Sequence, residues 1–281
     1  MVQEEDIQNF IASLRKLSDA FNFKFAEEFE VLIKEYFAPI KVYNLIGEGY
    51  FPIIERITIN KKVVNKNIRI DEVDKLKYPP AECVKSYGRA NLKNQSVFYG
   101  TFDFITAVKE MKPEKGDLIT ISRWTLKNKY DTLVICPMFL RQPTDRNSNI
   151  HLLNLYNWFI KELQRFPPQL SKPYFEVHRF YSDCFAREIS DNQGYILSAL
   201  LADKILNQYE GGKVDAIIYP STKVDLQNQN IAIKKDSFDK KYELSETSEK
   251  RLLYSSVNGD RYEFELFGES LKIDENKIIW K

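Results

Sequence analysis

Residues 87–111, YGRANLKNQSVFYGTFDFITAVKEM, decide the fold expected for this chain. Residues 88–91 predict a turn that carries a cation, and residues 96–99 predict a short apolar strand because turn formers stand on both sides of it. Thr101 or Asp103 can then cap a helix that runs to the end of the stretch. A turn, a strand and a helix are therefore expected in direct succession.

The expected helix holds a carboxylate close to a packed surface. Glu110 lies at the edge of its apolar face, so the side chain is kept against the core rather than projected into water. Arg89, Tyr99 and Glu110 place a cation, an aromatic hydroxyl and a carboxylate on three successive elements, which can aim them at one point. The apolar face consists of four residues at helical spacing, Phe104, Ala107, Val108 and Met111.

The same stretch resembles part of a known family. The order of the GRAN turn, SVFYG at 96–100 and ITAVKE at 105–110 is similar to that of the RES domain, named for its Arg, Glu and Ser. The family has a later serine at the end of a strand, and here DAIIYPS at 215–221 is followed by NIAI at 230–233. The resemblance extends over residues 50–235.

This resemblance implies an α+β fold like that of ADP-ribosyltransferases, with mixed or antiparallel sheets and flanking helices. It implies an enzyme of the glycosyltransferase class that uses NAD⁺ as its substrate and breaks the nicotinamide–ribose bond. Phosphorolysis, hydrolysis and ADP-ribosyl transfer to a protein all remain open as the outcome of that cleavage. Some family members are toxins, which implies an antitoxin protein as a partner.

The site residues carry over from the family motif position by position. The resemblance implies that Glu110 is the catalytic glutamate on the nicotinamide ribose, and that Arg89 binds the pyrophosphate and supports catalysis. It places Tyr99 beside the nicotinamide or its ribose, and Ser221 as a hydrogen-bonding, catalytic group in the nicotinamide pocket. Asn230, which opens the following strand, braces the serine loop in this interpretation.

Members of the family also carry an arginine on an early strand, ahead of the GRAN turn. Residues 53–59, IIERITI, are rich in β-branched side chains and predict such a strand. Arg56 within it is our choice for the cofactor-binding arginine, and Arg69 is the competing choice. An arginine on an edge strand that simply faces water is an equally good interpretation of either position.

The residue types themselves favour related chemistry. No serine–histidine pair has a supporting local context, because His151 and His178 lie far from Ser221 in the sequence. Neither GxGxxG nor the P-loop motif is present, and no convincing metal cluster appears, so no metal cofactor is expected. Arginines bind phosphate oxygens, and one carboxylate can stabilise an oxocarbenium-like centre when the leaving group is already cationic, as nicotinamide is in NAD⁺.

Composition restricts the general class of protein. The chain has 281 residues, with 41 Lys and Arg against 40 Asp and Glu, so the net charge of +1 does not favour nucleic acid or an anionic membrane as a partner. Three scattered cysteines without a CxxC motif favour a reducing compartment, and we expect the cytoplasm. No apolar run is long enough to cross a bilayer.

The pattern along the chain predicts an α+β protein, because strands and helices mix without regular βαβ alternation. Residues 1–48 are expected to form a helical N-terminal extension, with two amphipathic helices between residues 4 and 37 that pack on the main domain or form a homodimer interface. Residues 49–281 are expected to form the RES-like catalytic domain, with its core at 50–235 and a C-terminal hairpin at 250–281. Further expected elements are strands at 117–126, 133–139, 214–219 and 273–280, helices at 147–166, 175–189 and 195–209, and a hairpin at 251–267 that turns at Asn258-Gly259.

Two other functions compete with NAD⁺ cleavage. A protein with the same fold could bind a nucleotide without turning it over. A nucleic-acid-binding role would use the lysines at 234–235 and 240–241 together with tyrosines. The chain is also longer than compact toxin members of the family, since it has the helical extension, an insertion at 127–175 and the C-terminal hairpin.

Overall fold

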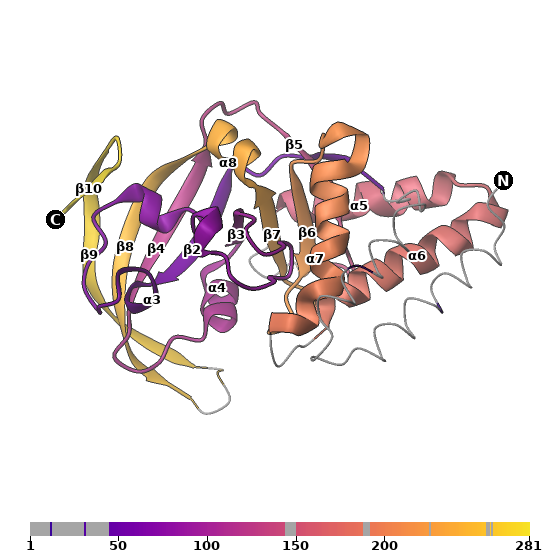
Figure 1. Cartoon of the computed structure of the whole chain (residues 1–281). Helices are drawn as coiled ribbons and strands as arrows, with labels where there is room; N and C mark the ends of the chain where they lie inside the picture. The colour runs from indigo at the N-terminus through magenta and orange to yellow at the C-terminus, as the bar shows by residue number, and fades with distance from the viewer. Residues whose placement is uncertain are drawn as a thin grey trace.

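The computed structural model describes residues 45–143, 150–187, 192–224, 226–256, 259 and 261–281, together with residues 12 and 31 (Figure 1). The two helices expected between residues 4 and 37 and the turn residue Asn258 therefore lie outside the described residues. None of the helices in the described ranges is long and apolar enough to span a bilayer.

The described residues form a sheet of ten strands in the order β1-β5-β6-β7-β3-β2-β4-β8-β9-β10. Every neighbouring pair is antiparallel except β5 and β6, which are parallel. A mostly antiparallel sheet with helices packed on it confirms the α+β class. The strands are β1 (Gly47–Gly49), β2 (Ile53–Ile59), β3 (Val97–Thr101), β4 (Leu118–Leu126), β5 (Leu133–Pro137), β6 (Ala216–Pro220), β7 (Gln229–Lys234), β8 (Tyr242–Ser255), β9 (Tyr262–Asp274) and β10 (Lys277–Trp280).

Six α-helices occur in the described part of the chain. Three of them, α5, α6 and α7, gather beside β5 and β6 at the right of Figure 1. Short 3₁₀ turns occupy Val73–Leu76, Ala81–Cys83, Asn192–Tyr195 and Tyr209–Gly211, and a π-helical turn occupies Lys204–Gln208. The α-helices are α3 (Asn60–Val64), α4 (Phe104–Met111), α5 (Ile150–Arg165), α6 (Pro168–Ala186), α7 (Ile196–Asp203) and α8 (Lys235–Lys241).

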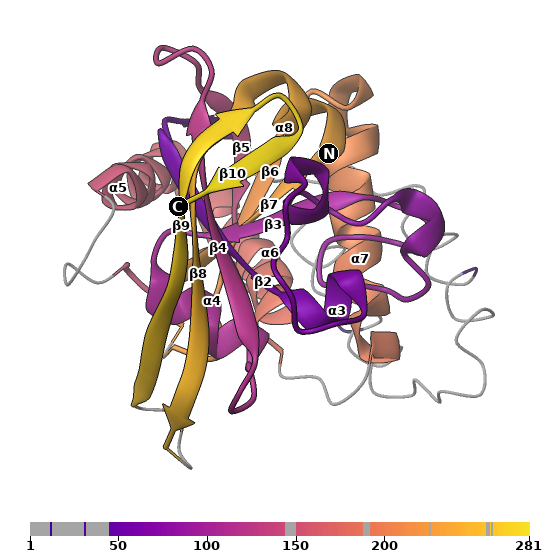
Figure 2. The same cartoon turned by 90° about the vertical axis from the view of Figure 1, so that its left-hand side faces the viewer.

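The alternation of side chains along β6 separates two hydrophobic cores. Ile217 and Tyr219 pack with residues of α6 and α7, whereas Ala216 and Ile218 face the cluster that contains residues of α5 and α8. Both faces of this central strand are thus covered by helices, as the turned view in Figure 2 also shows. A third, smaller core joins α4 to β2 and β4.

Helix α4 forms where the sequence predicts it, and the structure decides which residue caps it. Asp103 Oδ1 accepts a hydrogen bond from the Thr106 backbone N–H at 2.8 Å, and Asp103 Oδ2 accepts from the Thr106 hydroxyl at 2.6 Å. The cap is therefore Asp103 and not Thr101. The helix ends at Lys112, whose φ of 47° is left-handed.

Two element boundaries differ from the sequence expectation. Helix α6 begins at Pro168 rather than near residue 175, because a proline at the first helical position lacks only an N–H that would be unpaired there in any case. Strand β8 begins at Tyr242 rather than at 251. Its buried apolar residues are Tyr242, Leu244 and Leu252. Polar residues between Leu244 and Leu252 obscure the alternation of apolar and polar side chains that would predict a strand there.

The sheet is nearly interrupted between β2 and β3. In the described structure these strands share one paired position, Glu55 with Thr101, and then diverge. Beyond it, the Arg56 guanidinium Nη1 donates to the Tyr99 carbonyl oxygen at 2.7 Å, so a side chain makes the contact where the backbone ladder has stopped. We call this junction the seam.

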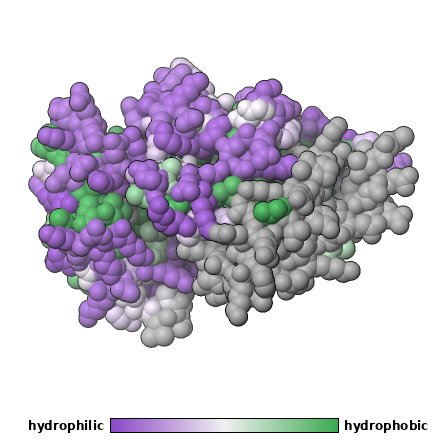
Figure 3. Space-filling view, viewed as in Figure 1, coloured by the Kyte–Doolittle hydropathy of each residue, from purple (hydrophilic) through white to green (hydrophobic). Residues whose placement is uncertain are grey.

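The surface seen in Figure 3 is mostly hydrophilic outside its grey part, with a hydrophobic area on the side of α3, β8 and β9. Several large apolar side chains of the C-terminal strands are indeed exposed. They are Leu253, Tyr254, Leu266, Phe267, Leu271 and Ile279.

Candidate functional site

A cavity of about 190 Å³ opens at the seam. Strands β2, β3, β6 and β7 form its floor, and the C-terminal part of α4 forms one wall. The lining residues that carry chemistry are Glu55, Arg56, Tyr99, Thr101, Glu110, Tyr219 and Asn230.

Glu110 reaches the cavity from α4, and two side chains hold it in place. The Ser221 hydroxyl donates to Glu110 Oε1 at 2.6 Å, and the Asn230 amide Nδ2 donates to the same oxygen at 2.8 Å. Ser221 itself is fully buried. Both donors act on one carboxylate oxygen, so the orientation of the carboxylate is fixed from β6 and β7 together.

The loop that carries Ser221 is anchored at both of its ends. The Ser221 backbone N–H donates to the Asn228 carbonyl at 2.8 Å, and the Leu226 N–H donates to the Ser221 carbonyl at 3.2 Å. The Asn228 side chain donates to the Thr106 hydroxyl on α4 at 2.7 Å. The serine loop and the helix that carries Glu110 are thus directly connected.

Arg56 is a cation without an acidic partner at the seam. No carboxylate in the described ranges forms an ion pair with it, and its buried Nε atom has no hydrogen-bond partner. Burial lowers the pKa of Arg56 to about 10, so the guanidinium is still charged at neutral pH. A half-buried positive charge without an acidic partner favours an anionic or strongly polar ligand.

The Tyr99 hydroxyl holds the 88–91 turn in place. It donates to Asn91 Oδ1 at 2.8 Å and accepts from the Ala90 N–H at 2.8 Å. Burial raises the pKa of Tyr99, so the hydroxyl stays protonated. At Gly88, a Cβ atom would lie 2.9 Å from this hydroxyl and 2.1 Å from Asn91 Oδ1, so the turn requires glycine there. The Tyr99 ring, rather than its hydroxyl, is therefore what a ligand in the cavity would meet.

Arg89 is not among the residues that line the cavity. Its guanidinium donates to the carbonyl oxygen of Phe185 and, at 3.1 Å, to that of Arg187, at the carboxyl end of α6. It also lies 4.9 Å from the centre of the Tyr195 ring and 6.0 Å from that of Tyr219. Tyr219 lines the cavity, so one aromatic ring separates Arg89 from the site.

The two candidates for the early arginine occupy different places. Arg56 lines the cavity, whereas Arg69 Nε donates to the buried Glu249 carboxylate at 2.8 Å. Arg69 also lies over the Trp280 ring at 4.8 Å, near the β10 edge of the sheet. Arg56, and not Arg69, thus lines the same cavity as Glu110.

A polar row crosses six strands at the level of the seam. Directly paired positions link each member to the next, so all of their side chains lie on one face of the sheet. From β6 to β8 the row is Tyr219, Asn230, Thr101, Glu55, Arg123 and Glu246.

Sequence reasoning missed Glu55, Thr101 and Tyr219 as members of the site. Glu55 stands next to Arg56 in the expected strand, and Tyr219 lies in the motif that ends with Ser221, so both had a local signal. Only the strand order shows that they meet, because it is the pairing of β2, β3 and β7 that aligns them.

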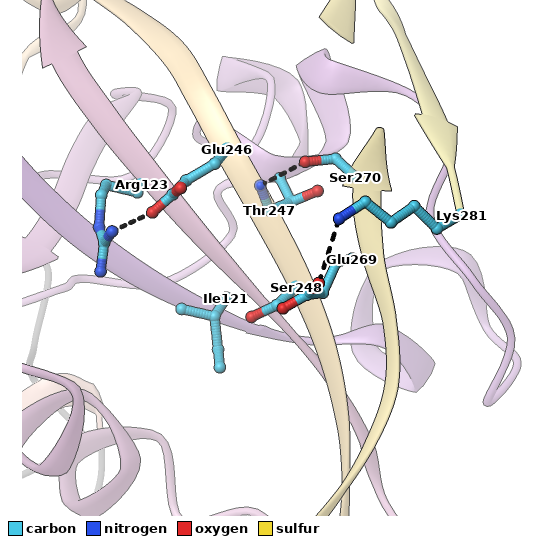
Figure 4. A pocket seen from close by; sticks show the side chains of 8 residues that line it. All are labelled: Ile121, Arg123, Glu246, Thr247, Ser248, Glu269, Ser270 and Lys281. Carbon is cyan, nitrogen blue, oxygen red and sulfur yellow. Dashed lines mark hydrogen bonds and ion pairs between the residues drawn. The ribbon is translucent and has the colours of Figure 1, made fainter. Parts of the chain in front are cut away.

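A second depression, of about 230 Å³, continues on the same sheet face beyond the Glu55–Arg123 ion pair (Figure 4). Its charged groups already form ion pairs with neighbouring side chains. Arg123 pairs with Glu246 as well as Glu55, and Lys281 pairs with Glu269 at 3.4 Å. This depression therefore has less unpaired charge to offer a ligand than the cavity at the seam has.

No model of a known protein family matches the sequence, and no curated protein matches it either. Function is therefore inferred from the cavity and its chemistry. A fixed carboxylate, a guanidinium without an acidic partner in the described residues and an aromatic ring surround a cavity of about 190 Å³. Such a set can stabilise a cationic centre and bind a polar heterocycle.

Proposed function

We propose that this protein cleaves NAD⁺ at the bond between nicotinamide and ribose, and that its sheet is of the ADP-ribosyltransferase-like kind. The observation that carries the proposal is the contact of Glu110 with both Ser221 and Asn230 beside the unpaired Arg56. The resemblance to the RES domain assigns Glu110 to the nicotinamide ribose and Ser221 to the nicotinamide pocket. It assigns Asn230 to bracing the serine loop and Arg56 to cofactor binding.

Unsatisfied polar atoms at the cavity support a carboxamide as the bound group. Arg56 Nε is an unpaired donor, and Asn230 Oδ1 is an unpaired buried acceptor. Leaving a buried polar group unpaired costs roughly 1–3 kcal/mol each. The nicotinamide carboxamide has one carbonyl acceptor and an NH₂ donor, which are the groups complementary to such a donor and acceptor.

The size of the cavity supports binding of one end of the dinucleotide. Pockets for whole drug-sized ligands have roughly 300–1,000 Å³. A cavity of about 190 Å³ accommodates the nicotinamide ring and part of its ribose, while the pyrophosphate and adenosine extend outside. Arg89 lies on the other side of Tyr219 from the cavity. It would bind the pyrophosphate outside the cavity once its hydrogen bonds to the carbonyl oxygens of Phe185 and Arg187 are broken.

The reaction needs little from the protein beyond electrostatics. The C1′–N bond breaks, and its electron pair goes to the pyridinium nitrogen, so nicotinamide leaves as a neutral molecule. Glu110 stabilises the positive charge that develops at the ribose C1′. An oxygen of phosphate, water or a protein side chain then forms the new bond to C1′, and a proton is lost where that oxygen carried one.

The test is to incubate the purified protein with NAD⁺, with and without phosphate, and to identify the products. The expected result is free nicotinamide together with ADP-ribose or its 1″-phosphate, and much less of either with Glu110→Gln. Binding of NAD⁺ without release of nicotinamide would instead show that the alternative, a non-catalytic nucleotide-binding protein, is correct. An antitoxin partner is a further proposal, tested by co-expression with the product of an adjacent gene.

A further inference from the structure

A larger pocket, of about 390 Å³, lies between α5 and α6. It is separate from the cavity at the seam and shares none of its lining residues. Its volume falls within the range of roughly 300–1,000 Å³ that is typical of small-molecule sites. We call it the α5–α6 pocket.

The pocket lies where the two parallel strands of the sheet end. Residues 139–141 follow β5, and Leu226 belongs to the loop that follows β6. In α/β sheets, the crevice beyond the carboxyl ends of parallel strands is a frequent place for ligands, because connecting loops there leave room above the sheet. Leu226 has a φ of 59°, an uncommon conformation for a branched residue.

Aromatic rings form the inner walls. Phe139 meets Tyr156 edge to face, with 5.3 Å between ring centroids, and Phe159 lies 4.4 Å from the His178 ring. Phe175 stands at the rim and is 49% exposed, so this large apolar side chain can contact a ligand that enters the pocket. Walls of this kind favour a flat apolar group between them.

His178 adds a polar group inside these walls. Its Nε2 lies 3.2 Å from the Phe139 carbonyl oxygen, which can only accept, so Nε2 carries the hydrogen. Burial lowers the pKa of His178 to about 4, and the ring is neutral at pH 7. Nδ1 is then an acceptor, and no residue in the described ranges donates to it.

Charged side chains stand at the rim. The lining residues include two arginines, Arg141 and Arg179, and one acid, Asp183. Arg179 forms no ion pair with any residue that the structure describes. A guanidinium at the mouth of an aromatic pocket is suited to a carboxylate or phosphate on a ligand whose ring enters the pocket.

We propose that the α5–α6 pocket is a binding site for a small aromatic anion, with the ring between Phe139, Tyr156 and Phe175 and the anionic group at Arg179. The proposal is independent of the chemistry at Glu110. It does have a physical connection to it, because the loop that contributes Leu226 to the pocket also holds Ser221, which donates to Glu110.

The probe is 2-naphthoate, titrated into the full-length protein by isothermal calorimetry. Two control molecules test the ring and the charge of naphthoate separately. 2-Naphthalenemethanol has the ring without the charge, and acetate has the charge without the ring. We expect saturable one-to-one binding of naphthoate and at least about tenfold weaker binding of both controls, since loss of one charge-assisted contact has about this effect.

Single substitutions test whether naphthoate binds in the α5–α6 pocket. Arg179→Gln and Phe175→Ala are both at the rim and should each weaken naphthoate binding about tenfold. Arg165→Gln changes an exposed arginine of α5 outside the pocket and should leave the affinity unchanged, as should Arg56→Gln at the seam. The proposal is overturned if naphthoate does not bind at millimolar concentration, if Arg179→Gln binds it as the parent does, or if Arg56→Gln weakens it equally.

Discussion

The hydroxyl of Ser221 donates to Oε1 of Glu110 at 2.6 Å, although the two residues are 111 positions apart in the sequence. The serine is fully buried, and its hydroxyl hydrogen is directed at this carboxylate oxygen. We therefore expect Ser221 to orient Glu110.

Glu110→Gln separates catalysis from binding. The substitution keeps the shape of the side chain and one acceptor but removes the charge that would stabilise the ribose C1′ cation. Turnover of NAD⁺ should fall about a hundredfold or more, while the Michaelis constant changes little. Glu243→Gln, an exposed glutamate on β8, is the matched control and should retain the parent rate. A Glu110→Gln protein that is folded and fully active would rule out this mechanism.

Ser221→Ala and Asn230→Ala test the positioning of Glu110. Each removes one of two donors to the same oxygen, so each should lower kcat about tenfold, and the double variant should deviate from the product of the two effects because the sites share a partner. The measurement is a double-mutant cycle on kcat with NAD⁺. Multiplicative effects would mean that the two side chains do not act through Glu110 together.

Arg89→Ala has a stability effect that the sequence did not predict. The guanidinium donates to the last carbonyls of α6, so its loss should lower the free energy of unfolding by about 2 kcal/mol. If Arg89 also binds the pyrophosphate, the Michaelis constant for NAD⁺ should rise as well. Urea unfolding and steady-state kinetics on the same preparation distinguish the two roles. A lower stability with an unchanged Michaelis constant would leave Arg89 as a helix cap only.

Glu249→Ala should be strongly destabilising. The carboxylate is fully buried, and it accepts hydrogen bonds from Arg69 and Asn60. Removing one partner of such a buried group costs about 3–5 kcal/mol. In contrast, Glu265→Gln removes a 3.9 Å ion pair with Arg251 at the surface and should cost at most about 1 kcal/mol. Equal effects in urea unfolding would show that the Glu249 network is not a structural support.

His178 should make stability depend on pH. The folded-state pKa of about 4 lies below the ordinary value of 6.5, so between these values the unfolded chain binds a proton that the folded protein does not. Stability from this residue is therefore complete above pH 6.5 and is lost as the pH falls toward 4, by about 3 kcal/mol in total. His178→Gln should flatten this part of the profile, measured by urea unfolding across the range. A parallel profile in the variant would assign the pH dependence to other groups.

Local signals in the sequence were sufficient for the elements that carry the site. The cap at Asp103, the apolar face of α4 and the strand expected at 214–219 each depend on residues that lie close together in the sequence, and the structure confirms these elements. The sequence predicts the start of α6 near residue 175 instead of at Pro168, because two adjacent prolines can end one helix and begin the next. The sequence predicts the start of β8 at residue 251 instead of at Tyr242. Polar and charged residues alternate with buried apolar ones in its first part, and such a composition is also typical of a loop.

The arrangement of the site required the strand order. Glu55 and Arg123 are paired across β2 and β4, and Asn230 reaches Glu110 only because β7 lies beside β3. Nothing in the spacing of these residues along the chain contains that information. Likewise, Arg89 and Arg56 both fitted an anion-binding role in the sequence. Only packing shows that Arg89 bonds to the end of a helix, whereas Arg56 lines the cavity without an ion pair to any described residue.

The single backbone pair between β2 and β3 divides the ten-stranded sheet into two panels, β1-β5-β6-β7-β3 and β2-β4-β8-β9-β10. Tyr99 and Asn230 belong to one panel, and Arg56 belongs to the other. A molecule that bonds to both sides adds the cross-links that the backbone ladder lacks. Occupancy of the cavity should therefore slow amide exchange in the strands on both sides of the seam.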